Sequence, residues 1–167
     1  MDLPPLKGKR IAALDFGTKR IGLAVTDELH ITISPRDILL TEAPELWDNI
    51  RRFIQIERLG AIVVGIPIRE DGSKTSIVKR IEKFILKLKV EIEIPIIEYD
   101  ESFSTQAAFQ TMIAGGMKKK QRQQKGMKDK IAAAVILRYF LEDYERFFFF
   151  LYAQVVIVIM SPIVKLS

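Results

Sequence analysis

The chain has 167 residues, which suits one domain with a substantial core and is too short for two ordinary domains joined by a linker. It contains no cysteine and a single histidine, His30, which excludes disulfides, cysteine-based zinc sites and any site that needs two histidines. A bound metal would need oxygen ligands, which favours Mg²⁺ or Mn²⁺. The net charge of +5 is local, because residues 118–130 hold seven basic residues and one acidic residue. Such a segment favours a phosphate-rich partner.

Residues 10–27 predict a β-hairpin with a carboxylate at the end of its first strand. Residues 11–14 form a short apolar run, typical of a strand covered on both faces, and residues 21–26 alternate as a second strand would. Asp15 ends the first strand, where an ionised side chain is costly unless neighbours hydrogen-bond it or a cation binds it. Gly22 leaves one face of the second strand open to close approach.

The remaining pattern predicts three more strands and four helices. Pro35 interrupts the third strand, which favours an edge position, and Gly60 is expected to stop the first helix. The order βββαβαβαα predicts an α/β fold with a mixed five-stranded sheet, three strands antiparallel and two parallel, and helices on both faces. In chain order these elements are a strand at 31–34, a helix at 44–59, a strand at 61–66, a helix from Ser73 or Thr75 to about 88, a strand at 95–101, and helices at 103–114 and 127–144.

Three acidic residues are candidates for chemistry. Asp15 and Glu101 end strands whose carboxyl ends should converge on one crevice, and Asp129 lies in the first turn of a helix, where the helix dipole favours an anion. Several carboxylates can hold two divalent ions about 4 Å apart for phosphodiester hydrolysis. In the alternative interpretation Asp15 is a turn former, Glu101 a solvated strand-end residue and Asp129 a helix-start acid.

Four ordered motifs carry a family resemblance: DFGTKRIGLA at 15–24, VVGIP at 63–67, DESFST at 100–105 and KDKIAAAVIL at 128–137. From about residue 9 to about residue 144 the chain resembles the "putative pre-16S rRNA nuclease" family, also called the putative Holliday junction resolvase family, which has an RNase H-like fold. The resemblance implies a metal-dependent endonuclease that processes the 5′ end of pre-16S rRNA in ribosome biogenesis. It also implies that Asp15, Glu101 and Asp129 are the catalytic acids and metal ligands. Branched DNA is the other substrate of this class, and a ribosomal subunit is a further expected partner.

One position departs from the family pattern. The family usually has Asp-Glu-Arg where this chain has Asp100, Glu101 and Ser102, so a cation that could hold the scissile phosphate is missing. Lys19 or Arg20 is the expected substitute. Candidate nucleic-acid contacts are Lys19, Arg20, Thr105, Lys118, Lys119, Lys120, Arg122, Lys125 and Lys128. The alternatives are that Thr105 caps a helix and that the basic run is only a solvated loop.

The two ends of the chain are predicted differently. The first ten residues, MDLPPLKGKR, have no apolar run of useful length, so we expect no secretory signal and a cytoplasmic protein. Residues 1–144 are expected to form the nuclease domain and residues 145–167 a hydrophobic extension. Residues 147–164 carry no charge over 18 positions, which just reaches the length of a membrane span. Gln154, Pro162 and a β-branched run favour a terminal strand, a covering extension or an oligomer contact instead, and a frameshifted C-terminus stays open.

Two other classes of function remain compatible with the sequence. A non-catalytic nucleic-acid or ribosome-binding module would keep the fold and lack chemistry because of Ser102. A phosphotransferase is the second, because DFGTKRIG also resembles the phosphate loop of the actin, Hsp70 and sugar-kinase superfamily. Those ATPases need two such lobes around the nucleotide, whereas this chain has room for one.

Overall fold

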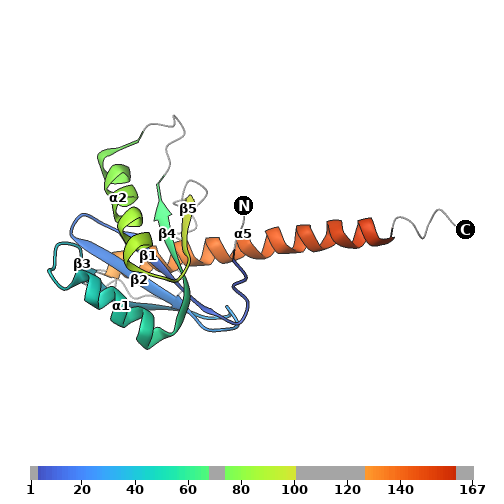
Figure 1. The fold of residues 1–167 in the computed structure, drawn as a ribbon, viewed down its shortest axis with the longest axis horizontal. Coiled ribbons are helices and arrows are strands. Elements are labelled where there is room, and N and C mark those ends of the chain that lie inside the picture. The colour runs from blue at the N-terminus through green and yellow to red at the C-terminus, as the bar shows by residue number, and fades with distance from the viewer. Residues whose placement is uncertain (1–3, 68–73, 101–126, 161–167) are drawn as a thin grey trace, which may run out of the picture.

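The computed structural model describes residues 4–67, 74–100 and 127–160, which form one sheet with helices on both faces (Figure 1). The apolar runs and alternating segments of the sequence form the strands, and segments with apolar residues three or four apart form the helices. The described elements are β1 (Arg10–Phe16), β2 (Arg20–Thr26), β3 (Ile33–Leu40), α1 (Leu46–Glu57), β4 (Leu59–Ile66), α2 (Ser76–Glu91), β5 (Ile96–Asp100) and α5 (Met127–Met160).

The sheet has five strands in the order β3-β2-β1-β4-β5. The first three strands form an antiparallel meander, in which Gly17 donates its N–H to the carbonyl of Arg20 across the turn at 2.9 Å. Strands β4 and β5 run parallel to β1. The carboxyl ends of β1, β4 and β5 therefore share one edge of the sheet, as the predicted mixed sheet requires.

Each face of the sheet has its own core, and the alternation of β1 explains how. Ala12, Leu14 and Phe16 pack toward α1 and α2, while Ile11 and Ala13 pack toward α5. Because β1 is central, the four residues from Ile11 to Leu14 are completely buried. This arrangement confirms the prediction of a strand covered on both faces.

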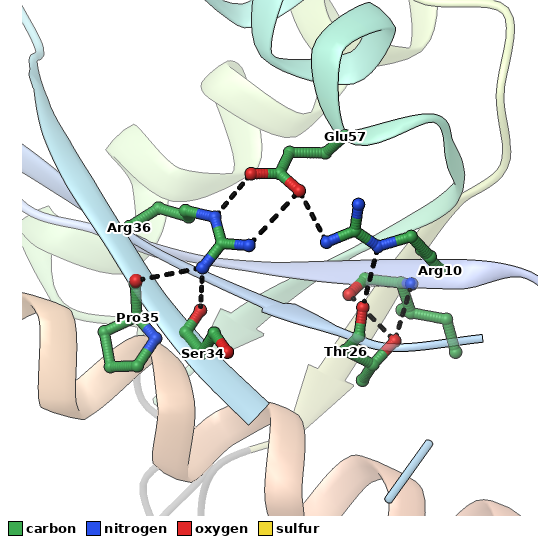
Figure 2. Close-up of polar contacts among 7 residues, drawn as sticks. Arg10, Thr26, Ser34, Pro35, Arg36 and Glu57 are labelled. Carbon is green, nitrogen blue, oxygen red and sulfur yellow. Dashed lines mark hydrogen bonds and ion pairs between the residues drawn. The ribbon is translucent and has the colours of Figure 1, made fainter. Parts of the chain in front are cut away.

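Helix α1 is held to the sheet by a buried carboxylate, Glu57, that sequence reasoning did not single out (Figure 2). Glu57 accepts hydrogen bonds from Arg36 of β3 and pairs with Arg10 of β1 at 2.5 Å. Arg10 also donates to the carbonyl of Thr26 at 3.1 Å. The hydrogen bond from Arg36 lowers the pKa of Glu57 below its ordinary value of 4.5. These contacts lie where β1 begins, at the end of the strand opposite Asp15.

The predicted breaks at Pro35 and Gly60 fall in the wrong places. Strand β3 runs through Pro35, which pairs with Ala24, because an edge strand needs no hydrogen bond from the outward side of the proline. Helix α1 ends before Gly60, at Glu57, and Arg58 takes the left-handed conformation with φ 51° while Gly60 lies inside β4. The edge position of β3 and the Thr75 cap of α2 are confirmed.

Helix α5 is longer than the sequence predicted. It continues past the expected end at Tyr144 to Met160, so the β-branched run that suggested a terminal strand is helical. No proline or glycine interrupts residues 127–160, which allows an established helix to continue. In Figure 1 the second half of α5 extends away from the sheet. Among the described residues, no helix combines the length and the apolar character that crossing a membrane requires.

Candidate active site

Asp15 lies on β1 one residue before the strand ends, and strand alternation turns its side chain to the α5 face. Ile11 and Ala13, on the same face, are buried against α5. Across the hairpin, Asp15 pairs in register with Gly22 of β2. The carboxylate therefore borders the space above Gly22.

That space is occupied by the first turn of α5. A Cβ added to Gly22 would lie 2.0 Å from the carbonyl oxygen of Asp129 and 2.5 Å from its carbonyl carbon, which no side chain could tolerate. The helix backbone thus rests directly on β2, in the open position that the sequence predicted at Gly22. Asp129 reaches the neighbourhood of Asp15 through this contact.

The two carboxylates interact electrostatically. Burial, and then the negative charge of Asp129, raise the pKa of Asp15 from 3.8 to about 6. Asp129 itself is half-buried, with a side-chain exposure of 34%. A raised pKa caused by burial and by a neighbouring acid marks Asp15 as a candidate functional residue, because the two like charges destabilise the protein when no cation is bound.

A guanidinium adjoins the acid pair. Arg20, the first residue of β2, places its Nε 3.5 Å from Oδ2 of Asp129. Sequence reasoning named Arg20 as a phosphate contact but missed this ion pair. The signal was the position of Arg20 two residues before Gly22, since alternate residues of a strand share a face.

The structure brings together two of the three predicted acids. Glu101 lies outside the described residues, and the residues that are described contain no group of three metal-ligating side chains. Asp100, which precedes Glu101, ends β5 at the same sheet edge as Asp15. Of the predicted nucleic-acid contacts, Lys19 lies in the β1–β2 turn, where its carbonyl accepts from Thr41 at 3.1 Å. Thr105, Lys118, Lys119, Lys120, Arg122, Lys125 and the side chain of Lys128 lie outside the described part.

The donor set suits a hard divalent cation. Asp15 and Asp129 offer carboxylate oxygens, which Mg²⁺ and Mn²⁺ prefer, and a cation between them would relieve their repulsion. Arg20 places a fixed positive charge beside the same pair.

Solved structures of Holliday junction resolvases share this architecture, which is an RNase H-like fold. The complex described as "T. thermophilus RuvC in complex with Holliday junction substrate" aligns with a TM-score of 0.53 at 14% identity, covering 80% of this chain and 95% of that chain. The fowlpox virus resolvase, solved with Holliday junction DNA, aligns with a TM-score of 0.51 at 14% identity. The alignment covers 81% of this chain and 98% of the viral chain. At these identities the likeness defines the fold.

Sequence comparison narrows the class to one family. The profile of the RuvX Holliday junction resolvase family matches residues 9–143, and the chain belongs to this nuclease family. A relative from Christiangramia forsetii, named "Putative pre-16S rRNA nuclease", is 38% identical over 79% of this chain and 97% of its own length. A Bacteroides fragilis protein of the same name is 37% identical over 80% of this chain and 96% of its own.

Proposed function

We propose that this protein is a divalent-metal-dependent endonuclease that hydrolyses phosphodiester bonds in structured RNA and matures the 5′ end of pre-16S rRNA. The observation that carries the proposal is the pairing of Asp15 with Asp129 beside Gly22, with the pKa of Asp15 raised to about 6. The names of the relatives support pre-16S rRNA as the substrate. Such a substrate would place the activity in the cytoplasm, at the assembling ribosomal subunit.

Asp15, Asp129 and Glu101 would hold the metal ions in this proposal. Glu101 directly follows Asp100, which ends β5 at the sheet edge of Asp15. A bound divalent metal supplies an activated water and stabilises the leaving oxygen of the phosphodiester. The carboxylates supply the negative charge that keeps a hard cation in place. Arg20 balances part of that charge, and we propose that it substitutes for the family arginine, which Ser102 replaces in this chain.

Binding of the nucleic acid would rely on lysine and arginine contacts to phosphate. Residues 118–130, immediately before and around Asp129, contain seven cations and no aromatic residue, which favours sequence-independent attraction over base stacking. Lys118, Lys119, Lys120, Arg122, Lys125 and Lys128, with Lys19, Arg20 and Thr105, are the proposed contacts. Such contacts would bring the phosphate backbone to the acids without choosing a sequence.

The experiment is a cleavage assay on precursor rRNA with Mg²⁺, Mn²⁺ or chelator. Asp15→Asn, Glu101→Gln and Asp129→Asn each keep the side-chain shape and remove the anion, so cleavage should fall by more than about 10²-fold while RNA affinity survives. Asp48→Asn is the matched control, since Asp48 is an exposed acid of α1 paired only with Arg51 among the described residues. Full cleavage in chelator, or by Asp15→Asn, would refute the metal site.

A branched DNA junction is the second candidate substrate, favoured by the family description and by the resolvase fold. The same assay on a four-way DNA junction separates the two. Cleavage of the junction with untouched precursor rRNA would assign the protein to recombination. Metal binding with cleavage of neither substrate would favour the non-catalytic module.

A further inference from the structure

A second cationic feature lies on the sheet face opposite the acids. Helices α1 and α2, which cover that face, enclose with the end of β1 a cleft of about 330 Å³ that we call the basic cleft. Its apolar side is aromatic, formed by Phe16, Trp47 and Phe84, and its rim carries Arg80, Lys83 and Lys87 of α2.

The three cations of the basic cleft gain little from the protein itself. Their spacing of three and four residues places them on one side of α2, where like charges repel. Arg80 faces one carboxylate, Glu42, at 3.8 Å, and that side chain is 83% exposed, so the pair is weak. Lys83 makes no ion pair with another described residue.

Two other lysines on or next to α2, Lys74 and Lys89, are paired with acids. Lys74 contacts Glu82 at 2.5 Å, and Lys89 contacts Glu98 at 2.6 Å. Of the α2 cations without an acidic partner among the described residues, Lys83 and Lys87 line the cleft and Lys79 lies outside it. An anionic ligand would stabilise the positive charge that gathers at the cleft.

Trp47 keeps one of these charges at the cleft. The Nζ atom of Lys87 lies 4.6 Å from the centroid of the Trp47 ring, a cation–π distance. The indole in turn lies 5.7 Å from the ring of Phe84, which packs on Phe16 at 4.6 Å. The Lys87 ammonium is thus held over packed aromatic rings. Because the side chain is already ordered, binding an anion costs less conformational entropy.

The basic cleft adjoins the acid site through the β1–β2 turn. Phe16 follows Asp15 directly, with the two side chains on opposite faces of the sheet. Thr41, which also lines the cleft, donates its hydroxyl to the carbonyl of Gly17 at 2.8 Å. A nucleic-acid strand that ran from Asp15 and Asp129 past the β1–β2 turn would therefore reach the basic cleft.

We propose that the basic cleft binds the phosphodiester backbone of the nucleic-acid substrate away from the scissile bond, an inference that rests on the nuclease function proposed above. Three cations facing one exposed carboxylate match a polyanion, and a chain of phosphates can engage them together. Phe16 and Phe84 are only 8% and 6% exposed, so the aromatic rings support the cations and do not offer faces for base stacking. Contact with phosphate makes the cleft indifferent to sequence.

The test compares two triple variants with the same change in net charge. The cleft variant carries Arg80→Gln, Lys83→Gln and Lys87→Gln, and the control carries Lys74→Gln, Lys79→Gln and Lys89→Gln outside the cleft. Both are made in the Asp15→Asn background, so that the nucleic acid stays intact. Fluorescence anisotropy measures affinity for single-stranded RNA, an RNA hairpin and a four-way DNA junction from low to high salt, and thermal melts check folding.

The cleft variant should bind at least one of these probes about tenfold more weakly than the control at low salt. Its plot of log affinity against log salt should be shallower by about two. Trp47→Leu, which releases Lys87, should lose part of the same affinity, and Trp47→Phe should retain more of it. The probe that shows the difference identifies RNA or DNA as the source of the backbone.

Equal affinity and equal salt slopes for the cleft variant and the control, on all three probes, overturn the proposal. That result does not affect the proposed nuclease function, because the roles of Asp15 and Asp129 are tested separately by the cleavage assay. Conversely, cleavage by Asp15→Asn removes the proposed acid site, while a selective loss of affinity in the cleft variant still supports the cleft.

Discussion

Asp15 is a residue whose ionisation works against folding. Because its pKa rises from 3.8 in the unfolded chain to about 6, the folded protein holds the proton more tightly. The free energy of unfolding therefore falls as the pH rises from about 4 to about 6 and stays lower above that range, at a cost of up to about 3 kcal/mol. Such a cost supports the proposed catalytic role of Asp15.

Asp15→Asn should consequently be more stable than the wild type in chelator at pH 8, by about 1–3 kcal/mol, and equally stable at pH 4 or below. Denaturant unfolding at the two pH values measures this difference. Adding Mn²⁺ should stabilise the wild type and leave the variant unchanged, because the amide cannot replace the anion. Lower stability of Asp15→Asn at both pH values would show that the carboxylate makes structural hydrogen bonds instead.

Gly22 is the second residue on which the site depends. Gly22→Ala places a methyl group 2.0 Å from the carbonyl oxygen of Asp129, so the start of α5 must move. We expect a loss of about 2–4 kcal/mol in the free energy of unfolding and a large loss of cleavage. Gly60→Ala is the comparison, since its methyl group would meet the side chain of Lys9 and no backbone atom among its nearest neighbours. Equal stability of the two variants would contradict the close contact.

At the scale of elements, Glu57 ties the end of α1 to two strands. Glu57→Gln removes the charge that Arg10 and Arg36 share, leaving two guanidinium groups, with side-chain exposures of 25% and 31%, without their partner. We expect a loss of about 1–3 kcal/mol at pH 7. Because the pKa of Glu57 is lowered, its contribution is present above the ordinary carboxyl pKa and is lost as the pH falls through the folded value.

Urea unfolding of Glu57→Gln and wild type between pH 7 and pH 2.5 follows this dependence. The difference between the two should shrink toward the acidic end. Asp48→Asn, on the same helix, should change stability by less than about 0.5 kcal/mol, because its ion pair with Arg51 is exposed. A difference that stayed constant with pH would show that packing of the side chain, and not its charge, stabilises the helix.

The elements differ in how far the sequence could predict them. The β1–β2 hairpin and the two helices α1 and α2 follow from local periodicity, which is why their existence was predicted correctly. The end of α5 was not predicted correctly, because a continuous apolar segment has no periodicity that would distinguish a helix from a strand. The course of β3 through Pro35 depends on which side of the strand is unpaired, and this is a property of the whole sheet.

The candidate site shows the same division. The missing side chain at Gly22 predicted that one face of β2 is open to close approach, but it did not predict that the first turn of α5 packs there beside Asp15. Two sets of ion pairs join residues far apart in sequence, Asp129 with Arg20 and Glu57 with Arg10 and Arg36. No local sequence pattern could have predicted them. The cations of the basic cleft did have a signal, their spacing along α2, but their meeting with Trp47 required the packed helices.

For the whole molecule, we predict that the nuclease domain folds without the residues after Tyr144. Tyr144 is buried, and its hydroxyl accepts from the N–H of Leu6 at 3.0 Å, whereas residues 145–149 are exposed. Truncation after Tyr144 should therefore keep a cooperative melt within a few degrees of the full chain. Truncation after Phe140, which removes the Tyr144 contacts, should melt markedly lower.

Calorimetry of the two truncated chains beside the full chain provides the measurement, and size-exclusion chromatography adds the state of association. Removing Phe147, Phe148 and Phe149, which are 40%, 39% and 77% exposed, should reduce self-association. An insoluble or non-cooperative chain after the first truncation would place the extension in the core.

The hydrogen bond between Leu6 and Tyr144 joins residues 138 positions apart, so it can form only after nearly the whole domain has been synthesised. During synthesis the sheet emerges first, while the face that α5 will cover stays open until almost the whole chain has left the ribosome tunnel. During that time Asp15 has been synthesised but Asp129, at the start of α5, has not yet packed beside it. If Asp15 and Asp129 act together as proposed, a chain that ends before α5 should therefore be unable to cleave nucleic acid.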